Sequence, residues 1–210
     1  MGAAERRPAD MKINIVLFQP EIPQNTGNIA RTCSATGSSL HLVHPLGFSL
    51  DEKHLRRAGL DYWDGLDIHQ YEDDEDFFTQ FSRLHPGDPI YFLSQKGPLS
   101  LWEVDFRTKP SGRLPAKASP DDLSECHSKA DAVEPAPSGE LWLAFGRESQ
   151  GLGDDILGRH IDSCIRIPMI AGRRSLNLSN AVAVVVYEAL RQTGGVGLVE
   201  HGILSGRNDA

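Results

Sequence analysis

The sequence has 210 residues, of which 40% are hydrophobic and 24% charged, a balance typical of one globular domain with a buried core. Acidic residues outnumber basic ones by 29 to 21, which gives a formal net charge of -8. This excludes a protein whose whole surface is basic, but a local basic patch on an acidic body stays compatible with it.

The sequence contains no segment typical of a membrane or secreted protein. The longest aliphatic run, residues 181–186, is far shorter than the ~20 residues that span a bilayer, and the N-terminus has no apolar signal region. Cys33, Cys126 and Cys164 form no CxxC pair, which argues against a disulfide framework or a zinc ribbon. We therefore expect a cytoplasmic protein with reduced, mostly buried thiols and no metal.

The first part of the chain predicts a strand followed by a helix. Residues 1–11 are polar and are expected to form a flexible tail, whereas 12–18 are apolar and β-branched, as in a buried strand. Residues 19–26 contain two prolines and are interpreted as a turn. A helix is expected over 27–36, with Gly37 just after its end.

Strands and helices are expected to alternate along the rest of the chain. The predicted strands are 40–44, 66–71, 89–95, 140–145 and 163–167, and the predicted helices are 50–58, 73–84, 154–160 and 178–192. Residues 105–139 are rich in proline, serine and charge, and are interpreted as a flexible insertion. Alternation of this kind predicts a single α/β domain over 12–192, with a mostly parallel sheet flanked by helices and a tail over 193–210.

Three polar segments follow predicted strands, where parallel sheets bind ligands. They are 25–31 (NTGNIAR), 145–151 (FGRESQG) and 167–180 (IPMIAGRRSLNLSN). Their glycines permit close approach of the backbone, and the helix starts that follow offer N–H groups to a polar ligand. Ordinary turns and helix caps are the alternative interpretation of the same residues.

Common nucleotide-binding and hydrolase motifs are missing from the sequence. It contains neither GxGxxG after the first strand nor GxxxxGK[ST], and it has no GxSxG. His41 and His44 form an HxxH pair without further metal-ligand spacing, so we interpret them as strand-end histidines.

Four longer stretches make a resemblance specific: 14–37 (NIVLFQPEIPQNTGNIARTCSATG), 50–63 (LDEKHLRRAGLDYW), 141–152 (LWLAFGRESQGL) and 165–192 (IRIPMIAGRRSLNLSNAVAVVVYEALRQ). Through them the chain resembles the RNA 2′-O-methyltransferases of the SPOUT superfamily, and among these the TrmL family that acts on cytidine 34 of tRNA. The resemblance covers 12–104 and 140–192. It implies a C-terminal trefoil knot, a homodimer and S-adenosylmethionine as the cofactor.

The resemblance also implies roles for individual residues. Leu93, Gly146, Ile167, Ser175 and the backbone near Leu176 match cofactor-binding positions. The positions that match catalytic or supporting residues are Asn25, Arg31, Glu148, Ser175 and Asn177.

Arg31 matches a position to which the family assigns the removal of the hydroxyl proton. Deprotonating a guanidinium at pH 7 costs roughly 7 kcal/mol, so we favour Arg31 as a group that positions the target phosphate and stabilises the developing alkoxide. A phosphate that first accepts the arginine proton is the route by which it could act as a base.

Purely structural roles are the alternative for several of these residues. Leu93 and Ile167 can be ordinary core residues, and Glu148 can be a carboxylate at a helix N-terminus. Ser179 and Asn180 can cap the last helix, and Asn177 can bond to backbone rather than to RNA.

A basic cluster is the best candidate for contact with RNA. It comprises Lys53, His54, Arg56 and Arg57, together with Arg173 and Arg174. A solvated charged surface is the alternative.

The expected function is methylation of the wobble nucleotide in the tRNA anticodon stem-loop. The alternatives are methylation of another tRNA or rRNA position, and a knotted RNA-binding factor without catalysis.

Overall fold

The computed structural model describes residues 11–49, 65–108, 139–195 and 197–201. The predicted helix 50–58, the tail before Met11 and most of the expected insertion lie outside these residues. A seven-stranded sheet forms the middle of the described part, in the order β3-β2-β1-β6-β4-β7-β5. All pairings between its strands are parallel, which confirms the predicted α/β class.

The strands agree with the predicted ones to within a few residues. They are β1 (Ile13–Phe18), β2 (Ser39–Val43), β3 (Ile68–Tyr71), β4 (Ile90–Leu93), β5 (Leu99–Ser100), β6 (Leu141–Phe145) and β7 (Cys164–Arg166). Of these, β5 was not predicted. It is too short for an alternating pattern and exists because Leu99 and Ser100 pair with Ile165 and Arg166 of β7.

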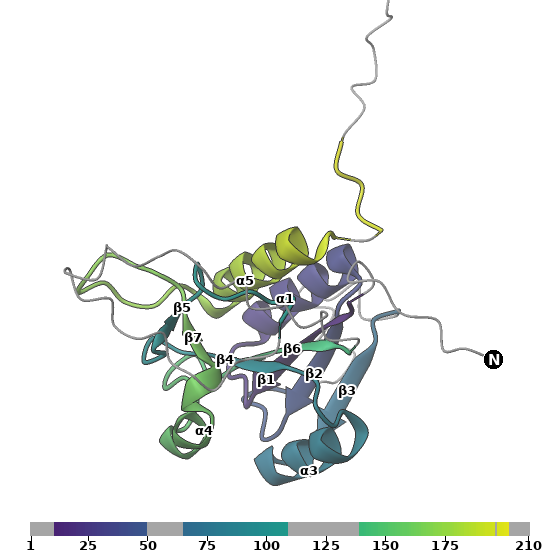
Figure 1. Cartoon of the computed structure of the whole chain (residues 1–210). Coiled ribbons are helices and arrows are strands. Elements are labelled where there is room, and N and C mark those ends of the chain that lie inside the picture. The colour runs from purple at the N-terminus through teal and green to yellow at the C-terminus, as the bar shows by residue number, and fades with distance from the viewer. Residues whose placement is uncertain (1–10, 50–64, 109–138, 196, 202–210) are drawn as a thin grey trace, which may run out of the picture.

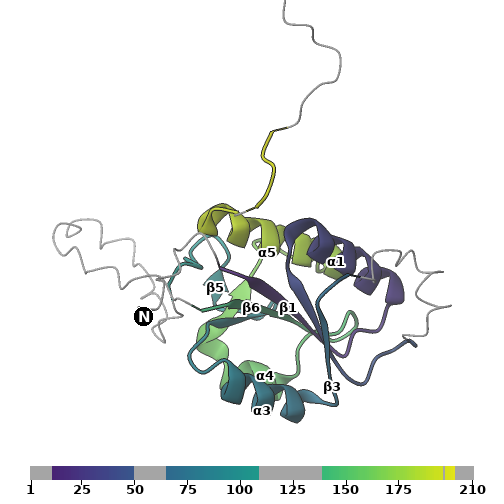
Figure 2. The ribbon, with the colours of Figure 1, turned by 90° about the vertical axis from the view of Figure 1, so that its right-hand side faces the viewer.

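Helices cover both faces of the sheet. Helices α1 (Pro23–Thr36) and α5 (Leu178–Thr193) pack side by side on one face, while α3 (Asp74–Leu84) and α4 (Asp154–Arg159) cover the other (Figures 1 and 2). A 3-10 turn, η2 (Ile161–Ser163), leads into β7. No helix in the described ranges is both long and apolar enough to cross a membrane.

Helix α1 begins four residues before the predicted start, at Pro23 rather than Gly27. Proline is well tolerated as the first residue of a helix because its missing N–H would have no partner there. The interpretation of 19–26 as a turn was therefore wrong for its second half. The predicted end is confirmed, since Gly37 adopts the left-handed conformation with a φ of 70°.

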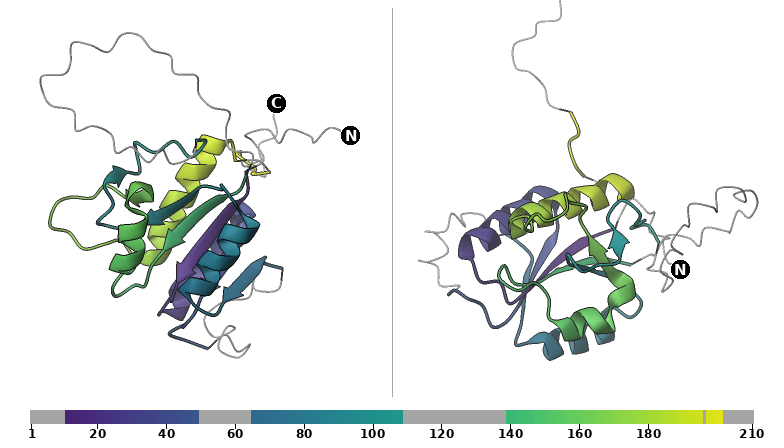
Figure 3. Two further views of the ribbon diagram at one scale, coloured as in Figure 1. Left: turned by 60° about the horizontal axis from the view of Figure 1, so that its bottom comes forward. Right: turned by 90° about the vertical axis from the view of Figure 1, so that its left-hand side faces the viewer.

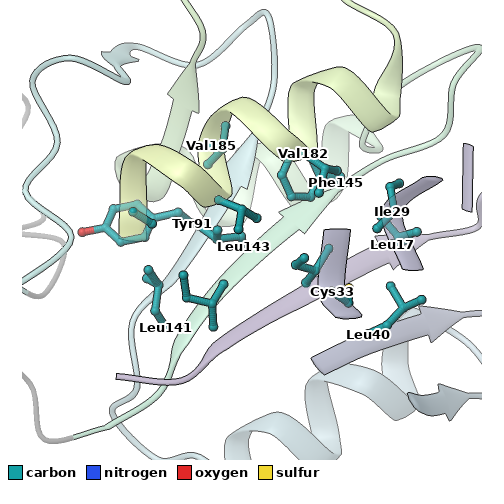
Figure 4. Packing of buried hydrophobic residues seen from close by; sticks show 14 of the residues in the cluster. Leu17, Ile29, Cys33, Leu40, Tyr91, Leu141, Leu143, Phe145, Val182 and Val185 are labelled. Carbon is teal, nitrogen blue, oxygen red and sulfur yellow. The ribbon is translucent and has the colours of Figure 1, made fainter. Parts of the chain in front are cut away.

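Helix α5 confirms the prediction made for its valine-rich segment. Its N-cap is Asn177, whose side chain accepts a hydrogen bond from the Ser179 N–H, so neither Ser179 nor Asn180 is the cap. Gly194 ends the helix with a φ of 90°. One face of α5 is buried against the sheet, as Val182 and Val185 show in Figure 4.

Two apolar cores lie on the two faces of the sheet. The first packs α1 and α5 against alternate residues of the strands, among them Leu17, Leu143 and Phe145 (Figure 4). The second packs α3 and α4 against the opposite residues, including Phe92 and Trp142. Alternation of this kind is what a strand buried on both faces requires.

The first residues of the expected insertion belong to the body of the fold. Phe106 is fully buried and packs edge to face on Tyr91, with ring centroids 5.2 Å apart. Its backbone N–H donates to Gln192 of α5 at 2.8 Å, and the Tyr91 hydroxyl donates to the Thr108 carbonyl. The described body thus reaches Thr108, because a single aromatic residue anchors a segment that is otherwise polar.

Candidate active site

The strand order reverses between β1 and β6, which are neighbours in the middle of the sheet. They pair in parallel with Leu17 opposite Phe145, so both end at the same edge (Figure 3, left). From there the chain leaves β1 toward α1 on one face and leaves β6 toward α4 on the other. Such a reversal opens a space between two diverging loops, which is where open α/β sheets bind ligands.

Glu148, in the loop after β6, reaches across this space to the start of α1. Its carboxylate accepts hydrogen bonds from the backbone N–H of Glu21 at 2.8 Å and from that of Ile22 at 3.2 Å. It also accepts one from Nδ2 of Asn25 at 2.9 Å. Glu148 thus has the alternative role considered for it, that of a carboxylate at a helix N-terminus. The helix is α1, which lies far from Glu148 in the sequence.

Asn25 connects Glu148 to the start of the last helix. Its side chain is 5% exposed and its Oδ1 accepts from Nδ2 of Asn177 at 2.9 Å. Asn177 in turn accepts from the N–H and the hydroxyl of Ser179. Three segments that are far apart in the sequence are thus joined by one hydrogen-bonded chain, Glu148–Asn25–Asn177.

A second carboxylate at this junction was missed by the sequence analysis. Glu21 accepts hydrogen bonds from the backbone N–H of Ser149 at 3.0 Å and from its hydroxyl at 2.8 Å. Glu21 lies between two prolines in a segment interpreted as a turn, and no local spacing links it to residue 149. Only the adjacency of β1 and β6 brings the two together.

The expected cofactor residues lie at the ends of three neighbouring strands, β6, β4 and β7. Leu93 pairs with Phe145 and Ile165, so Gly146 and Ile167 lie at the same edge. Leu93 and Ile167 are half-buried and pack against the core, in keeping with the open alternative of a core role. Half-buried aliphatic side chains beside irregular backbone are also what an adenine slot requires, so this edge fits the cofactor.

Gly146 is required by the path of its own loop. A Cβ at this position would lie 2.1 Å from the carbonyl carbon of Gly151, because Arg147 and Gly151 exchange backbone hydrogen bonds across a tight turn. The turn directs Glu148 toward α1. Any larger residue would displace the loop that carries the carboxylate.

The segment between β7 and α5 holds the remaining expected residues. Ser175 and Leu176 are exposed and directly precede Asn177, and Arg173 and Arg174 are exposed beside them. Arg31 is also exposed, on α1 two turns after Asn25. The structure thus joins Asn25, Glu148 and Asn177 by hydrogen bonds and leaves Arg31, Ser175 and Leu176 exposed. Lys53, His54, Arg56 and Arg57 lie outside the described residues.

Comparison with known proteins identifies relatives that cover most of the chain. Residues 12–187 match the SpoU rRNA Methylase family. A Saccharophagus degradans protein named tRNA (cytidine(34)-2′-O)-methyltransferase is 41% identical, over 88% of this chain and 97% of its own length. A protein of the same name from Burkholderia pseudomallei is also 41% identical, over 86% of this chain and 96% of its own.

Solved structures share the fold. One, described as "Structural insights into the 2-OH methylation of C/U34 on tRNA", is 37% identical with a TM-score of 0.67, over 88% of this chain and 98% of its own. The Streptomyces viridochromogenes SpoU methyltransferase AviRb, solved with its cofactor AdoMet, has a TM-score of 0.61 at 21% identity, over 86% of this chain and 57% of its own. The chain belongs to the SpoU methylase family.

Proposed function

We propose that the protein transfers a methyl group from S-adenosylmethionine to the ribose 2′-oxygen of nucleotide 34 of tRNA. The observation that carries the proposal is the Glu148–Asn25–Asn177 chain at the carboxyl ends of β1 and β6. It joins the three polar segments that follow predicted strands, each of which lies within a stretch that carries the resemblance. Relatives of nearly equal length bear the name of this activity.

The cofactor is assigned to the edge formed by Leu93, Gly146 and Ile167, with Ser175 and Leu176 closing the site. When bound, S-adenosylmethionine supplies an electrophilic methyl group. The apolar side chains of Leu93 and Ile167 would flank the adenine, and the backbone near Leu176 would offer donors and acceptors to it. Ser175, exposed in the loop before α5, is the hydroxyl group that we assign to the site.

Arg31, Asn25, Glu148, Ser175 and Asn177 form the proposed catalytic set. Arg31 holds the target phosphate and stabilises the negative charge that develops on the 2′-oxygen as its proton leaves. Asn25, Glu148 and Asn177 fix the start of α1, the helix that carries Arg31. Their hydrogen bonds hold the Asn25 amide in one orientation. A catalytic group such as Arg31 needs neighbouring residues that are held rigidly in this way.

The tRNA anticodon stem-loop is assigned to the surface around the loop before α5. Arg173 and Arg174 are exposed there and suit contacts with phosphates. Lys53, Arg56 and Arg57, which lie outside the described residues, are also proposed to contact RNA phosphates. Binding of this kind weakens steeply as salt concentration rises.

A homodimer is part of the proposal. Val184 and Tyr187 lie three residues apart on the outward face of α5 and are 44% and 54% exposed. Ile170 and Leu176, in the preceding loop, are 78% and 41% exposed. Large apolar side chains exposed to this degree are suited to a surface that a second copy covers. Light scattering after gel filtration tests this: we expect the mass of a dimer for the wild type and a shift toward the monomer for Tyr187→Arg.

We also propose a domain organisation, a chain topology and a cellular location for the protein. We assign residues 12–192 to one methyltransferase domain whose C-terminal part forms a trefoil knot. The knot is proposed from the family resemblance, and the segment after β4 packs closely on β7, where a Cβ at Gly97 would lie 2.7 Å from the Ile165 backbone. A crystal structure that traces residues 93–193 tests the knot. The cytoplasm is the expected location, because the substrate is tRNA.

Transfer of a radiolabelled methyl group from S-adenosylmethionine tests the activity. Purified protein is incubated separately with tRNA lacking position-34 methylation, with ribosomal RNA and without RNA. Incorporation into tRNA alone is the expected result. Incorporation into ribosomal RNA alone would overturn the substrate assignment, and cofactor binding without any transfer would favour a non-catalytic RNA-binding factor.

A further inference from the structure

A cluster of three potential metal ligands lies at the end of the sheet opposite the candidate active site. It consists of His85, which ends α3, Asp88, which precedes β4, and Glu140, which precedes β6. One ligand atom from each lies within 4.8 Å of the others. Glu140 and Gly146 bracket β6, so at ~3.3 Å per residue the cluster is about 20 Å from the proposed cofactor edge.

The sheet itself brings the two carboxylates together. Ile90 of β4 pairs with Trp142 of β6, and Asp88 and Glu140 each lie two residues before these partners. Residues two apart on a strand share a face, so both carboxylates project toward the α3 side. The strand register therefore brings the backbones of these two residues near each other.

His85 completes the cluster from the end of α3. Its Nδ1 lies 3.3 Å from Oδ2 of Asp88 and 3.8 Å from Oε2 of Glu140. Its ring packs against the buried Trp142 ring, with centroids 4.6 Å apart. Two ligands bound tetrahedrally to zinc at about 2.1 Å lie about 3.4 Å from each other, so small side-chain movements suffice to bind an ion.

Two neighbouring features support the ligand geometry. Asn14 is 1% exposed and donates from Nδ2 to Oε2 of Glu140 at 2.9 Å, which orients that carboxylate as an outer partner does in metal sites. Gly139 leaves room for Asp88, because a Cβ there would lie 1.7 Å from Oδ1 of Asp88. The absence of a side chain at residue 139 thus permits the carboxylate to sit beside Glu140.

We propose that His85, Asp88 and Glu140 bind one divalent transition-metal ion, with water in the remaining positions. One imidazole nitrogen and two carboxylate oxygens suit Zn²⁺ or Mn²⁺ better than Mg²⁺, which prefers oxygen ligands alone. The ion would neutralise two adjacent carboxylates and tie the end of α3 to β4 and β6. The sequence predicted no metal because His85 and Asp88 are 52 residues or more from Glu140 along the chain.

Calorimetric titration of the full-length, chelator-treated protein with ZnCl₂ tests the site. We expect the wild type to bind one equivalent of Zn²⁺ that His85→Gln and Glu140→Gln lose, each with at least a tenfold fall in affinity. Gly139→Ala is expected to have the same effect by displacing Asp88. His69→Gln is the matched control, since His69 also contacts a carboxylate, that of Asp67 at 2.9 Å, without belonging to the cluster.

Thermal unfolding gives a second readout that does not depend on methyl transfer. At a hundredfold excess of Zn²⁺ over its dissociation constant, the wild-type Tm is expected to rise by roughly 5 °C, and that of Glu140→Gln is expected to stay unchanged. Zinc binding that persists in both His85→Gln and Glu140→Gln would overturn the site. So would wild-type protein that binds no Zn²⁺ at micromolar concentrations, which would make the cluster an ion pair.

Discussion

Glu21 and Glu148 each accept hydrogen bonds from the other's loop. Glu148 accepts from the backbone N–H of Glu21, and Glu21 accepts from the backbone N–H of Ser149, the next residue. This reciprocal contact closes the junction where β1 and β6 diverge. It also explains how α1 begins at Pro23 with no side-chain cap from its own N-cap residue, Ile22, whose N–H is bound by the distant Glu148.

Replacing Glu148 by glutamine is expected to destabilise this junction. The carboxylate accepts hydrogen bonds from three N–H donors. In glutamine an NH2 group replaces one carboxylate oxygen, so it faces some of these donors and cannot accept from them. Because hydrogen bonds to a charged acceptor contribute about 1.5–3 kcal/mol, we expect the free energy of unfolding to fall by about 2 kcal/mol. Urea unfolding measures this. Glu75→Gln, at an exposed position of α3, is the control, and an equal loss there would contradict the account.

Two substitutions of Asn177 separate its contacts. Asn177→Asp keeps the oxygen that caps α5 but removes the donor to Asn25, whereas Asn177→Ala removes both. We expect the alanine variant to lose about 1 kcal/mol more stability than the aspartate variant. Methyl transfer is expected to fall in both, because Asn25 loses its partner. Full activity in Asn177→Asp would show that the bond to Asn25 has no role in turnover.

Arg31→Lys tests the proposed stabilisation of the alkoxide. Lysine keeps the charge but cannot present the planar, forked donors of arginine. We expect S-adenosylmethionine binding, measured by calorimetry, to stay within a factor of two or so of wild type, while kcat falls roughly 100-fold. Near-normal turnover would remove Arg31 from the mechanism.

The sequence predicted the regular elements better than the contacts between them. Apolar runs and capping residues placed β1, β6 and α5 to within a residue or so of their observed bounds. The short strand β5 and the anchor Phe106 were missed, since each depends on a partner far along the chain. Strand order has no local signal at all.

In the candidate site, too, the individual residues could be predicted better than the contacts between them. The resemblance selected Asn25, Glu148 and Asn177, and the structure joins them by hydrogen bonds. Glu21 was missed because its partner, Ser149, is 128 residues away and adjacent only through the β1–β6 pairing. The local sequence pattern identifies polar residues at strand ends. Which of these residues come into contact depends on the strand order of the sheet.

Stability is expected to fall in mildly acidic solution because of His41. This residue is 3% exposed, and burial lowers its pKa from 6.5 to about 3, so it stays neutral in the folded protein. The unfolded chain takes up a proton below pH 6.5 and the folded chain does not, so stability falls as pH drops from 6.5 toward 3. At pH 5 the loss is about 2 kcal/mol. Urea unfolding at pH 7.5 and pH 5 should show a smaller difference for His41→Gln than for wild type or the exposed His201→Gln.

Two cysteines are expected to resist alkylation in the folded protein. Burial raises the pKa of the Cys33 thiol to about 12 and that of Cys164 to about 11, so neither forms the reactive thiolate near neutral pH. Treatment with iodoacetamide at pH 8, followed by peptide mapping, should label both only after denaturation. Rapid labelling of Cys33 in native protein would contradict the packing of α1 on the sheet.

Nucleoside mass spectrometry of tRNA gives the most direct test of the central claim. Transfer RNA that lacks position-34 methylation is incubated with the protein and S-adenosylmethionine, then digested and mapped. A 2′-O-methylated pyrimidine at the wobble position, strongly reduced with Arg31→Lys, is the predicted result. A methyl group at any other position would contradict the substrate assignment, and the absence of methylation despite bound cofactor would contradict the activity itself.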